Sequence, residues 1–256
     1  MQDLVNNQEL TKRAIEAISK KDFIKPLPKT SSKTPPILYV FRHGQSQDNE
    51  QYYFSGWRDP DLTKLGQDQA KILANKLKYE NFDLAVSSTL KRAIQTLDLV
   101  LAENTAWSFP PDTLTLCKAS QADISTAYPK KPTEIVKAYL TYKVLLDDRL
   151  IERSYGELQG TSKVELYLKD QKIEEKYRRA YDFPTKNGES LKMVEERVKL
   201  FLEELLPFMK ERKINVVLSC HSNSMRALRR FMENLTIEEM CALENPLAQD
   251  FASYKI

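Results

Sequence analysis

Short apolar runs alternate with amphipathic segments along most of the chain. Residues 37–41 and 214–218 are strongly apolar and rich in β-formers, and residues 83–86 form a shorter run of the same kind. Runs of this length are typical of strands that are buried on both faces of a parallel sheet. Amphipathic segments separate them, so the pattern predicts an α/β fold with a mostly parallel central sheet flanked by helices.

Helical spacing of apolar residues, three and four positions apart, extends over most of the remaining sequence. We expect helices at residues 63–78, 90–101, 134–146, 162–180, 187–209 and 225–231. Residues 104–134 show no regular pattern and contain four prolines. Prolines at this density interrupt regular structure, so we expect an inserted flap there.

The first part of the chain differs in composition from the rest. Residues 1–22 are polar and compatible with a helix, and residues 23–36 carry four prolines among Lys, Ser and Thr. The second stretch is typical of a linker. We therefore expect residues 1–36 to be an N-terminal extension and linker, and residues 37–256 to form one catalytic domain.

Composition and charge narrow the class of protein. The chain is 41% hydrophobic and 29% charged, which is ordinary for a globular protein, and its net charge of +3 is too small to favour nucleic acid or a membrane surface as a partner. No apolar run is long enough to span a bilayer, and the N-terminus lacks the apolar centre of a signal peptide. The three cysteines lie far apart, as in a reduced compartment. We therefore expect a cytoplasmic protein whose partners are neither nucleic acid nor a membrane.

Two histidines carry the strongest chemical signal. His43 and His221 are the only histidines of the chain, and each follows one of the two strongly apolar runs. The carboxyl ends of parallel strands meet at one edge of a sheet, where ligands bind, so these two rings are expected to lie together. Arg42 and Arg92 can reach the same edge. Neutral imidazoles among guanidinium groups suit a dianionic oxyanion, above all phosphate.

These residues predict phosphoryl transfer through a covalent intermediate. A ring nitrogen of His43 can attack phosphorus and hold the group as phosphohistidine, while the guanidinium groups stabilise the equatorial oxygens. Nearby cations also keep His43 deprotonated at neutral pH, as a nucleophile requires. The leaving oxygen needs a proton, and Glu152, beside Arg153 and Tyr155, is the carboxyl group that we expect to act as acid and base.

Two other mechanisms fit the sequence less well. Two histidines without a carboxylate or cysteine at ligand spacing make a weak metal site, so no metal is expected. Cys220 and Arg226 have the spacing of the loops in cysteine-dependent phosphatases. Those loops need glycines that aim successive N–H groups at phosphate, and residues 221–225 contain none, so we expect Cys220 to be a small buried hydrophobic residue.

With these residues in place, the chain resembles the histidine phosphatase superfamily and, within it, the cofactor-dependent phosphoglycerate mutases. The resemblance covers most of residues 37–243. Its motifs are Arg42-His43-Gly44-Gln45-Ser46 with Asn49, Ser55-Gly56-Trp57 with Asp59, Leu90-Lys91-Arg92-Ala93 with Thr96, Glu152-Arg153 with Tyr155-Gly156, Gly188-Glu189-Ser190-Leu191, and His221 with Asn223-Ser224. The Glu152 motif, together with Lys163 and the pair Arg178-Arg179, is the part most specific to mutases.

The resemblance implies a three-layer sandwich of the phosphoglycerate mutase type, and it implies interconversion of 3-phosphoglycerate and 2-phosphoglycerate in glycolysis and gluconeogenesis. It also implies 2,3-bisphosphoglycerate as primer, no metal, and a homodimer as one oligomeric form. The implied catalytic residues are His43, Glu152, His221, Arg42 and Arg92. The implied substrate-binding residues are Gln45, Ser46, Asn49, Ser55, Gly56, Arg153, Tyr155, Lys163, Arg178, Arg179, Ser222 and Asn223.

The chain departs from the mutase pattern at four places. Ser222 stands where the family has glycine, the segment between Thr96 and Leu150 is longer, Pro246-Leu247-Ala248 replaces Pro-Thr-Gly, and no basic tail follows Ile256. Such a tail keeps water from the phosphohistidine, so its loss favours hydrolysis. Two alternatives to a mutase therefore stay open: a phosphatase acting on small phosphorylated metabolites, and a non-catalytic protein that binds phosphorylated ligands.

Overall fold

A five-stranded sheet forms the centre of the computed structural model, which describes residues 8–19, 25–108, 135, 139–140 and 143–256. The strands lie in the order β3–β2–β4–β1–β5. Their bounds are β1 Ile37–Arg42, β2 Leu84–Ser87, β3 Val144–Leu146, β4 Val216–Cys220 and β5 Ala252–Lys255. The first four are parallel and β5 is antiparallel to β1, so the predicted mostly parallel sheet is confirmed.

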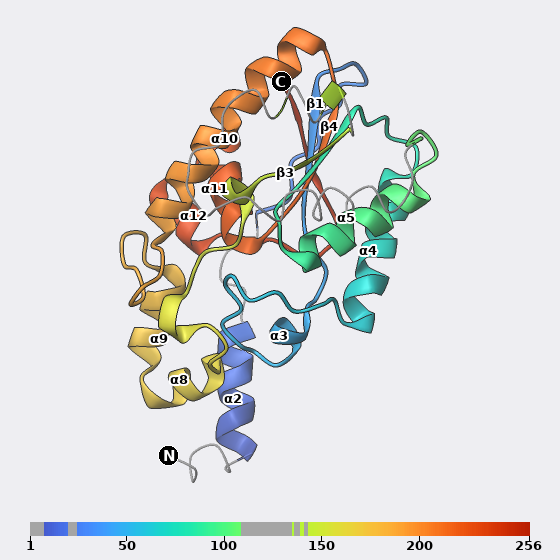
Figure 1. Ribbon diagram of the computed structural model, residues 1–256. Coiled ribbons are helices and arrows are strands. Elements are labelled where there is room, and N and C mark those ends of the chain that lie inside the picture. The colour runs from blue at the N-terminus through green and yellow to red at the C-terminus, as the bar shows by residue number, and fades with distance from the viewer. Residues whose placement is uncertain (1–7, 20–24, 109–134, 136–138, 141–142) are drawn as a thin grey trace.

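Helices cover both faces of the sheet (Figure 1). Helices α4 (Lys64–Leu77) and α5 (Lys91–Glu103) lie on one face, and α10 (Leu191–Arg212), α11 (Ser222–Glu233) and α12 (Ile237–Ala242) lie on the other. Side chains of β1 alternate between them: Tyr39 and Phe41 pack with α4 and α5, whereas Leu38 and Val40 pack with α10 and α11. Burial on both faces explains the continuous apolar runs, and the three-layer sandwich is confirmed.

Smaller elements gather beyond the carboxyl ends of the parallel strands (Figure 1). They are α2 (Gln8–Ser19), α3 (Gln47–Glu50), α8 (Lys163–Lys169), α9 (Gln171–Arg179) and the short 3₁₀ turns Asp148–Leu150 and Gly156–Leu158. A single helix was expected at residues 162–180, but Asp170 has extended backbone there and its side chain caps α9 by accepting from the N–H of Ile173. Asp170 therefore divides the segment into α8 and α9.

Two strands were not predicted. Helical spacing favoured a helix over residues 134–146, but residues 144–146 form β3, which pairs in parallel with Ala85–Ser87. That helix prediction is therefore wrong at its carboxyl end, because pairing with β2 overrides the local spacing. The other missed strand, β5, pairs with Ile37–Val40 at the sheet edge. Most of the expected flap at residues 104–134 lies outside the described residues.

The described residues of the N-terminal segment contact several parts of the molecule, including α11, where Arg229 donates to the carbonyls of Lys25 and Pro26. Ala14 and Ile18 of α2 form a small apolar cluster with Val164 of α8. Residues 25–36 run beside β5, where the N–H of Thr30 donates to the carbonyl of Ser253. The segment thus packs against the elements that lie beyond the strand ends and against the edge of the sheet.

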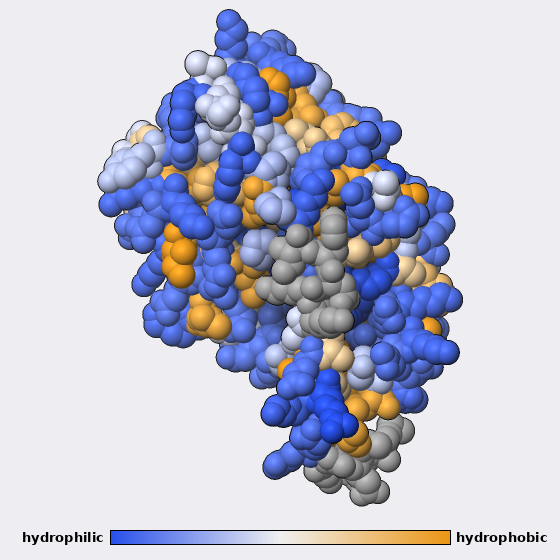
Figure 2. All heavy atoms as spheres, turned by 180° about the vertical axis from the view of Figure 1, so that it is seen from behind, coloured by the Kyte–Doolittle hydropathy of each residue, from blue (hydrophilic) through white to orange (hydrophobic). Residues whose placement is uncertain are grey.

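The described surface is mainly polar. On the face shown in Figure 2, hydrophilic residues predominate among the coloured atoms and hydrophobic ones occur in small groups. None of the described helices is both long and apolar enough to cross a membrane.

Candidate active site

The two histidines meet where β1 and β4 end. Arg42 and Cys220 are partners in the parallel register, so His43 and His221 leave the sheet side by side. The N–H of His43 donates to the carbonyl of Cys220 at 3.0 Å, which continues the ladder by one residue. The ring centroids are 5.0 Å apart, and both side chains are buried.

The His43 ring is held in one tautomer. Its Nδ1 lies 2.6 Å from the carbonyl oxygen of Gly44, and since a carbonyl can only accept, Nδ1 carries the proton. Nε2 therefore keeps its lone pair, toward which Nε of Arg92 donates at 3.3 Å. Burial, then Arg92 and Arg42, lower the pKa of His43 well below its usual value. The ring is thus a neutral nucleophile whose free nitrogen lies beside a guanidinium group.

His221 contacts a hydroxyl that sequence reasoning missed. Its Nε2 and the Oγ of Ser88 are hydrogen bonded at 2.6 Å, and its Nδ1 is buried without a hydrogen-bond partner among the described residues. Burial, followed by Arg92 and His43, lowers the pKa of His221. Ser88 follows β2, so the rule that places residues at strand ends could also have found it.

The two predicted arginines are fixed by backbone carbonyls. Arg92, in the first turn of α5, donates to the carbonyls of Arg58 at 2.8 Å and Gly56 at 2.9 Å. Arg42 donates from Nη1 to the carbonyl of Asn245 at 3.0 Å, while its Nε has no hydrogen-bond partner among the described residues. Burial lowers the pKa of Arg92 to about 10, so its charge persists at neutral pH. Both cations are therefore held in place before any ligand arrives.

Glu152 lies at the N-terminus of α11. Its two carboxylate oxygens accept from the N–H groups of Ser222 and Asn223, each at 3.1 Å. These donors have no intrahelical acceptors, and the helix dipole favours negative charge at this end. The indole of Trp57 donates to the carbonyl of Glu152 at 2.7 Å and fixes the backbone. Ser222, despite replacing the glycine of the family, thus holds the carboxylate through its N–H.

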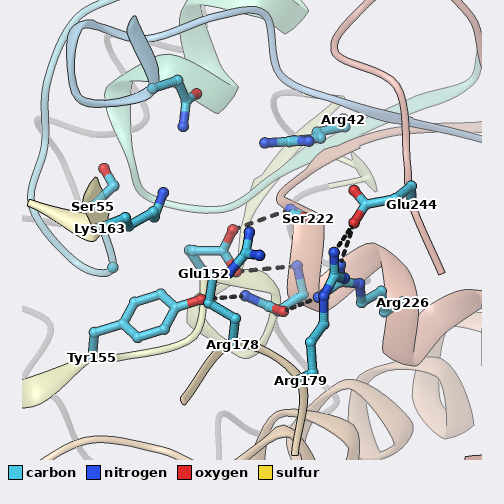
Figure 3. Close-up of a pocket in the computed structure, with 13 residues that line it drawn as sticks. Arg42, Ser55, Glu152, Tyr155, Lys163, Arg178, Arg179, Ser222, Arg226 and Glu244 are labelled. Atoms are coloured by element: carbon cyan, nitrogen blue, oxygen red, sulfur yellow. Dashed lines mark hydrogen bonds and ion pairs between the residues drawn. The ribbon is translucent and has the colours of Figure 1, made fainter. Parts of the chain in front are cut away.

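A pocket of about 140 Å³ is lined by Arg42 and Glu152 (Figure 3). Of the other predicted catalytic residues, His43, Arg92 and His221 are not among its lining residues. This volume corresponds to roughly ten water-sized volumes, the scale of a small phosphorylated metabolite. Its lining residues are Arg42, Asn49, Ser55, Gly56, Glu152, Tyr155, Lys163, Arg178, Arg179, Ser222, Asn223, Arg226 and Glu244. Five of these side chains are cationic and two are carboxylates, so the pocket is built for an anion.

Three predicted binding residues do not line this pocket. The Gln45 side chain accepts from the hydroxyl of Thr63 at 2.8 Å, and Ser46 caps α3. Arg153 is fully buried and donates to the carbonyls of Glu189 at 2.7 Å and Phe183 at 3.0 Å. These side chains hold neighbouring loops in place rather than facing the cavity.

Two residues of the pocket were not predicted as part of the site. Arg226, one turn into α11, donates to Asn223 Oδ1 at 2.9 Å and lies 3.4 Å from the carboxylate of Glu244. Glu244 also pairs with Arg179. In the sequence, Arg226 stands out only by its spacing from Cys220, which is that of a cysteine-dependent phosphatase loop. The Cys220 thiol instead donates to the carbonyl of Phe41 at 3.4 Å, and burial raises its pKa, so it cannot serve as a thiolate.

Lys163 and Arg178 lie together in the pocket (Figure 3). Arg178 pairs with Glu174 at 2.7 Å and donates to the carbonyl of Ile18 in α2 at 3.2 Å. The Lys163 ammonium lies 5.6 Å from the centre of the Phe54 ring and makes no ion pair with any described carboxylate. Burial, then Arg178 and Arg42, lower the pKa of Lys163 to about 8.

This lowered pKa predicts a pH dependence of ligand binding. Lys163 is charged below about pH 8 and loses its proton as the pH rises through that value, so the pocket loses one positive charge. We expect the KM for a ligand with two anionic groups to rise across this range. Lys163→Met should have a raised KM at pH 7 and no inflection near pH 8. Steady-state kinetics on both sides of pH 8 measures this.

Lys169→Met is the matched control, because Lys169 ends the same helix α8 and is exposed. It should keep the inflection of the unsubstituted protein. An inflection near pH 8 that persists in Lys163→Met would assign it to another group.

Within the described ranges, no three or more side chains of His, Cys, Asp and Glu converge in a way that could hold a metal ion.

Comparison with known proteins connects this geometry to a family. The family model of the histidine phosphatase superfamily (branch 1) matches residues 38–112 and 130–249. Proteins of Nitrobacter winogradskyi and Methanococcus vannielii, both named 2,3-bisphosphoglycerate-dependent phosphoglycerate mutase, are 37% and 36% identical over 213 residues. The alignments cover 81% and 82% of this chain and 86% of each relative.

Solved structures share the fold at lower identity. A mycobacterial glucosyl-3-phosphoglycerate phosphatase bound to VO3 aligns with a TM-score of 0.62 at 22% identity, over 85% of this chain and 91% of that one. The α-ribazole phosphatase of Shigella flexneri aligns with a TM-score of 0.61 at 20% identity, over 85% and 89%. Family model, relatives and fold agree: the chain belongs to the histidine phosphatase superfamily.

Proposed function

We propose that the protein interconverts 3-phosphoglycerate and 2-phosphoglycerate through phosphohistidine at His43, primed by 2,3-bisphosphoglycerate. The observation that carries the proposal is a neutral Nε2 of His43, under the charge of Arg42, together with a pocket that Arg42 lines jointly with Lys163 and Arg178. A phosphatase needs only the cations that hold the phosphoryl group. The further cations suit a second anionic group, such as the carboxylate of a phosphoglycerate.

The proposed reaction begins on the phosphorylated enzyme. The free hydroxyl of 3-phosphoglycerate attacks the phosphoryl group on Nε2 of His43, while Glu152 accepts the hydroxyl proton. The P–N bond breaks, and the ligand is then 2,3-bisphosphoglycerate. After it turns in the pocket, Nε2 attacks its other phosphoryl group. Glu152 returns the proton to the leaving oxygen, and 2-phosphoglycerate departs from phosphorylated His43.

Arg42 and Arg92 stabilise both transfers. Arg42 lines the pocket, and Arg92 donates toward Nε2 of His43. When phosphorus occupies that position, the same donors face the equatorial oxygens, on which negative charge develops in the transition state. Their fixed carbonyl contacts mean that little reorganisation is needed.

A phosphatase acting on small phosphorylated metabolites is the second candidate. Glu244 pairs with Arg179 and Arg226, and so neutralises part of the charge that would hold a second anionic group. A weaker hold on the reoriented ligand would let water accept the phosphoryl group instead.

One experiment separates these candidates. Unphosphorylated protein is mixed with 3-phosphoglycerate, with and without 2,3-bisphosphoglycerate, and ³¹P NMR follows both the isomer and inorganic phosphate. A mutase produces 2-phosphoglycerate, with a burst that depends on the primer. Phosphate release that far outpaces isomer formation would replace the mutase with the phosphatase. A protein that only binds phosphorylated ligands would produce neither.

The proposed reaction also suggests a cellular compartment. As a step of glycolysis and gluconeogenesis, the reaction would take place in the cytoplasm. The homodimer stays a prediction, which light scattering of the purified protein checks.

A further inference from the structure

We propose that Glu244 is a specificity-determining residue that competes with the second anionic group of the ligand and so weakens the binding of bisphosphates. The inference deepens the proposed function and rests on it for the identity of the ligands. Glu244 was not among the expected site residues, and its role concerns the far end of the ligand rather than the reacting phosphorus.

The position of Glu244 supports this role. It follows α12 and lines the pocket, with its side chain 18% exposed. Figure 3 shows its carboxylate pointing at two guanidinium groups, those of Arg179 from α9 and Arg226 from α11. Two helices that come from different parts of the chain thus direct cations at one resident carboxylate.

The same two guanidinium groups are well placed for a ligand. Arg226 is buried and is already fixed by the carbonyl of Leu243 at 2.6 Å and by Asn223 Oδ1 at 2.9 Å. Burial lowers the pKa of Arg226 to about 10, so the side chain stays charged at neutral pH. A ligand carboxylate or phosphate that reached these arginines would need the position that the Glu244 carboxylate now holds.

The charge of the pocket indicates for which ligands Glu244 weakens binding most. Five cationic side chains and two carboxylates line it, which leaves an excess of three positive charges. A phosphoryl group carries about two negative charges near neutral pH, and a bisphosphate therefore carries about four before its carboxylate is counted. While Glu244 stays charged and in place, the positive charge of the lining balances the negative charge of one phosphoryl group and one carboxylate. It does not balance the charge of a second phosphoryl group.

The structure also offers space for the displaced side chain. Glu244 borders a second cavity of about 190 Å³, which is lined on its other side by Lys25, Pro26 and Leu27. A carboxylate that leaves Arg179 and Arg226 can turn toward this cavity. Displacement costs the two ion pairs but requires no movement of the helices, so bisphosphates still bind, only more weakly.

Binding to three ligands tests the proposal. The ligands are 2,3-bisphosphoglycerate, 3-phosphoglycerate and glycerol 3-phosphate, which has a neutral hydroxymethyl group in place of the carboxylate. Calorimetric titrations are made in a His43→Ala background, which prevents turnover. Glu244→Gln should bind the bisphosphate about tenfold more tightly, which corresponds to about 1.4 kcal/mol, and 3-phosphoglycerate several-fold more tightly. Its affinity for glycerol 3-phosphate should change by less than about twofold.

The control is Glu211→Gln. Glu211 is an exposed residue of α10, so this substitution makes the same change in net charge at the surface. It should shift none of the three affinities by more than about twofold. Glu244→Asn repeats the main comparison with a shorter amide, should the Gln variant fail to fold.

A purely structural role for Glu244 gives a different result. If the carboxylate served only to position Arg179 and Arg226, its removal would weaken all ligands that reach them, and a bisphosphate bound no more tightly by Glu244→Gln would overturn the proposal. The measurement records binding and not isomerisation. It therefore decides the role of Glu244 even if the NMR experiment rejects the mutase.

Discussion

Replacing His43 with alanine is expected to abolish phosphoryl transfer, with a loss of at least about 10⁴-fold in rate. Nε2 of His43 is a neutral ring nitrogen that is oriented by the hydrogen bond from Nδ1 to the carbonyl of Gly44, whereas burial raises the pKa of the Cys220 thiol. Intact-mass spectrometry of protein mixed with 2,3-bisphosphoglycerate measures the covalent adduct. The adduct should form on the unsubstituted protein and be absent from His43→Ala.

Two checks accompany this experiment. The variant should keep its thermal unfolding transition and bind phosphate, because Arg42 and Arg92 are held by backbone carbonyls and not by the His43 ring alone. The adduct should also be labile in acid and stable in base, as expected for a P–N bond. An adduct that persists in His43→Ala would assign the nucleophile to another residue and remove the basis of the proposed function.

Replacing Glu152 with glutamine should lower the rate of transfer from phosphoglycerates by about 10²- to 10⁴-fold. In the proposed reaction the carboxylate accepts and returns the proton of the substrate hydroxyl, and an amide cannot do so. With p-nitrophenyl phosphate, whose leaving group needs no proton, the loss in the first transfer step should be small. The ratio of the two losses, measured in burst kinetics, isolates acid catalysis from binding.

Glu157→Gln is the matched control for this variant. Glu157 lies five residues along the same loop, is about half exposed and pairs with Lys186 at the surface. Its replacement should affect neither substrate. Equal losses on both substrates in Glu152→Gln would show that the carboxylate acts by holding Ser222 and Asn223 in place, which it contacts through their N–H groups.

The core of the fold was predictable because strands that are buried on both faces consist of continuous apolar runs. The runs at residues 37–41 and 214–218 form β1 and β4, and the residues that follow them lie together for topological reasons. The strand at residues 144–146 was not predictable in this way, because three apolar residues fit a helix and a strand equally well. These residues form a strand because β2 lies beside them, and the spacing of apolar residues does not reveal that neighbour.

The site residues that belong to sequence motifs were predictable, and those outside any motif were not. Lys163, Arg178 and Tyr155 were identified because they belong to such motifs, and they do line the pocket. Glu244 belongs to none. It reaches the pocket because the segment after α12 folds across the end of α11, where Arg226 binds the carbonyl of Leu243. A contact of this kind depends on tertiary packing, which no local pattern records.

Because α2 contacts Arg178, which lines the pocket, cleavage of the chain near α2 would weaken ligand binding even though α2 lies far from the histidines. Arg178 donates to the carbonyl of Ile18. This is one of the last carbonyls of α2, for which the helix itself provides no N–H donor. A protease that nicks the chain ahead of the sheet would release this anchor while leaving His43 and its neighbours untouched. Batches of the protein that differ in KM but agree in kcat should therefore be compared first by the intact mass of their N-terminal segment.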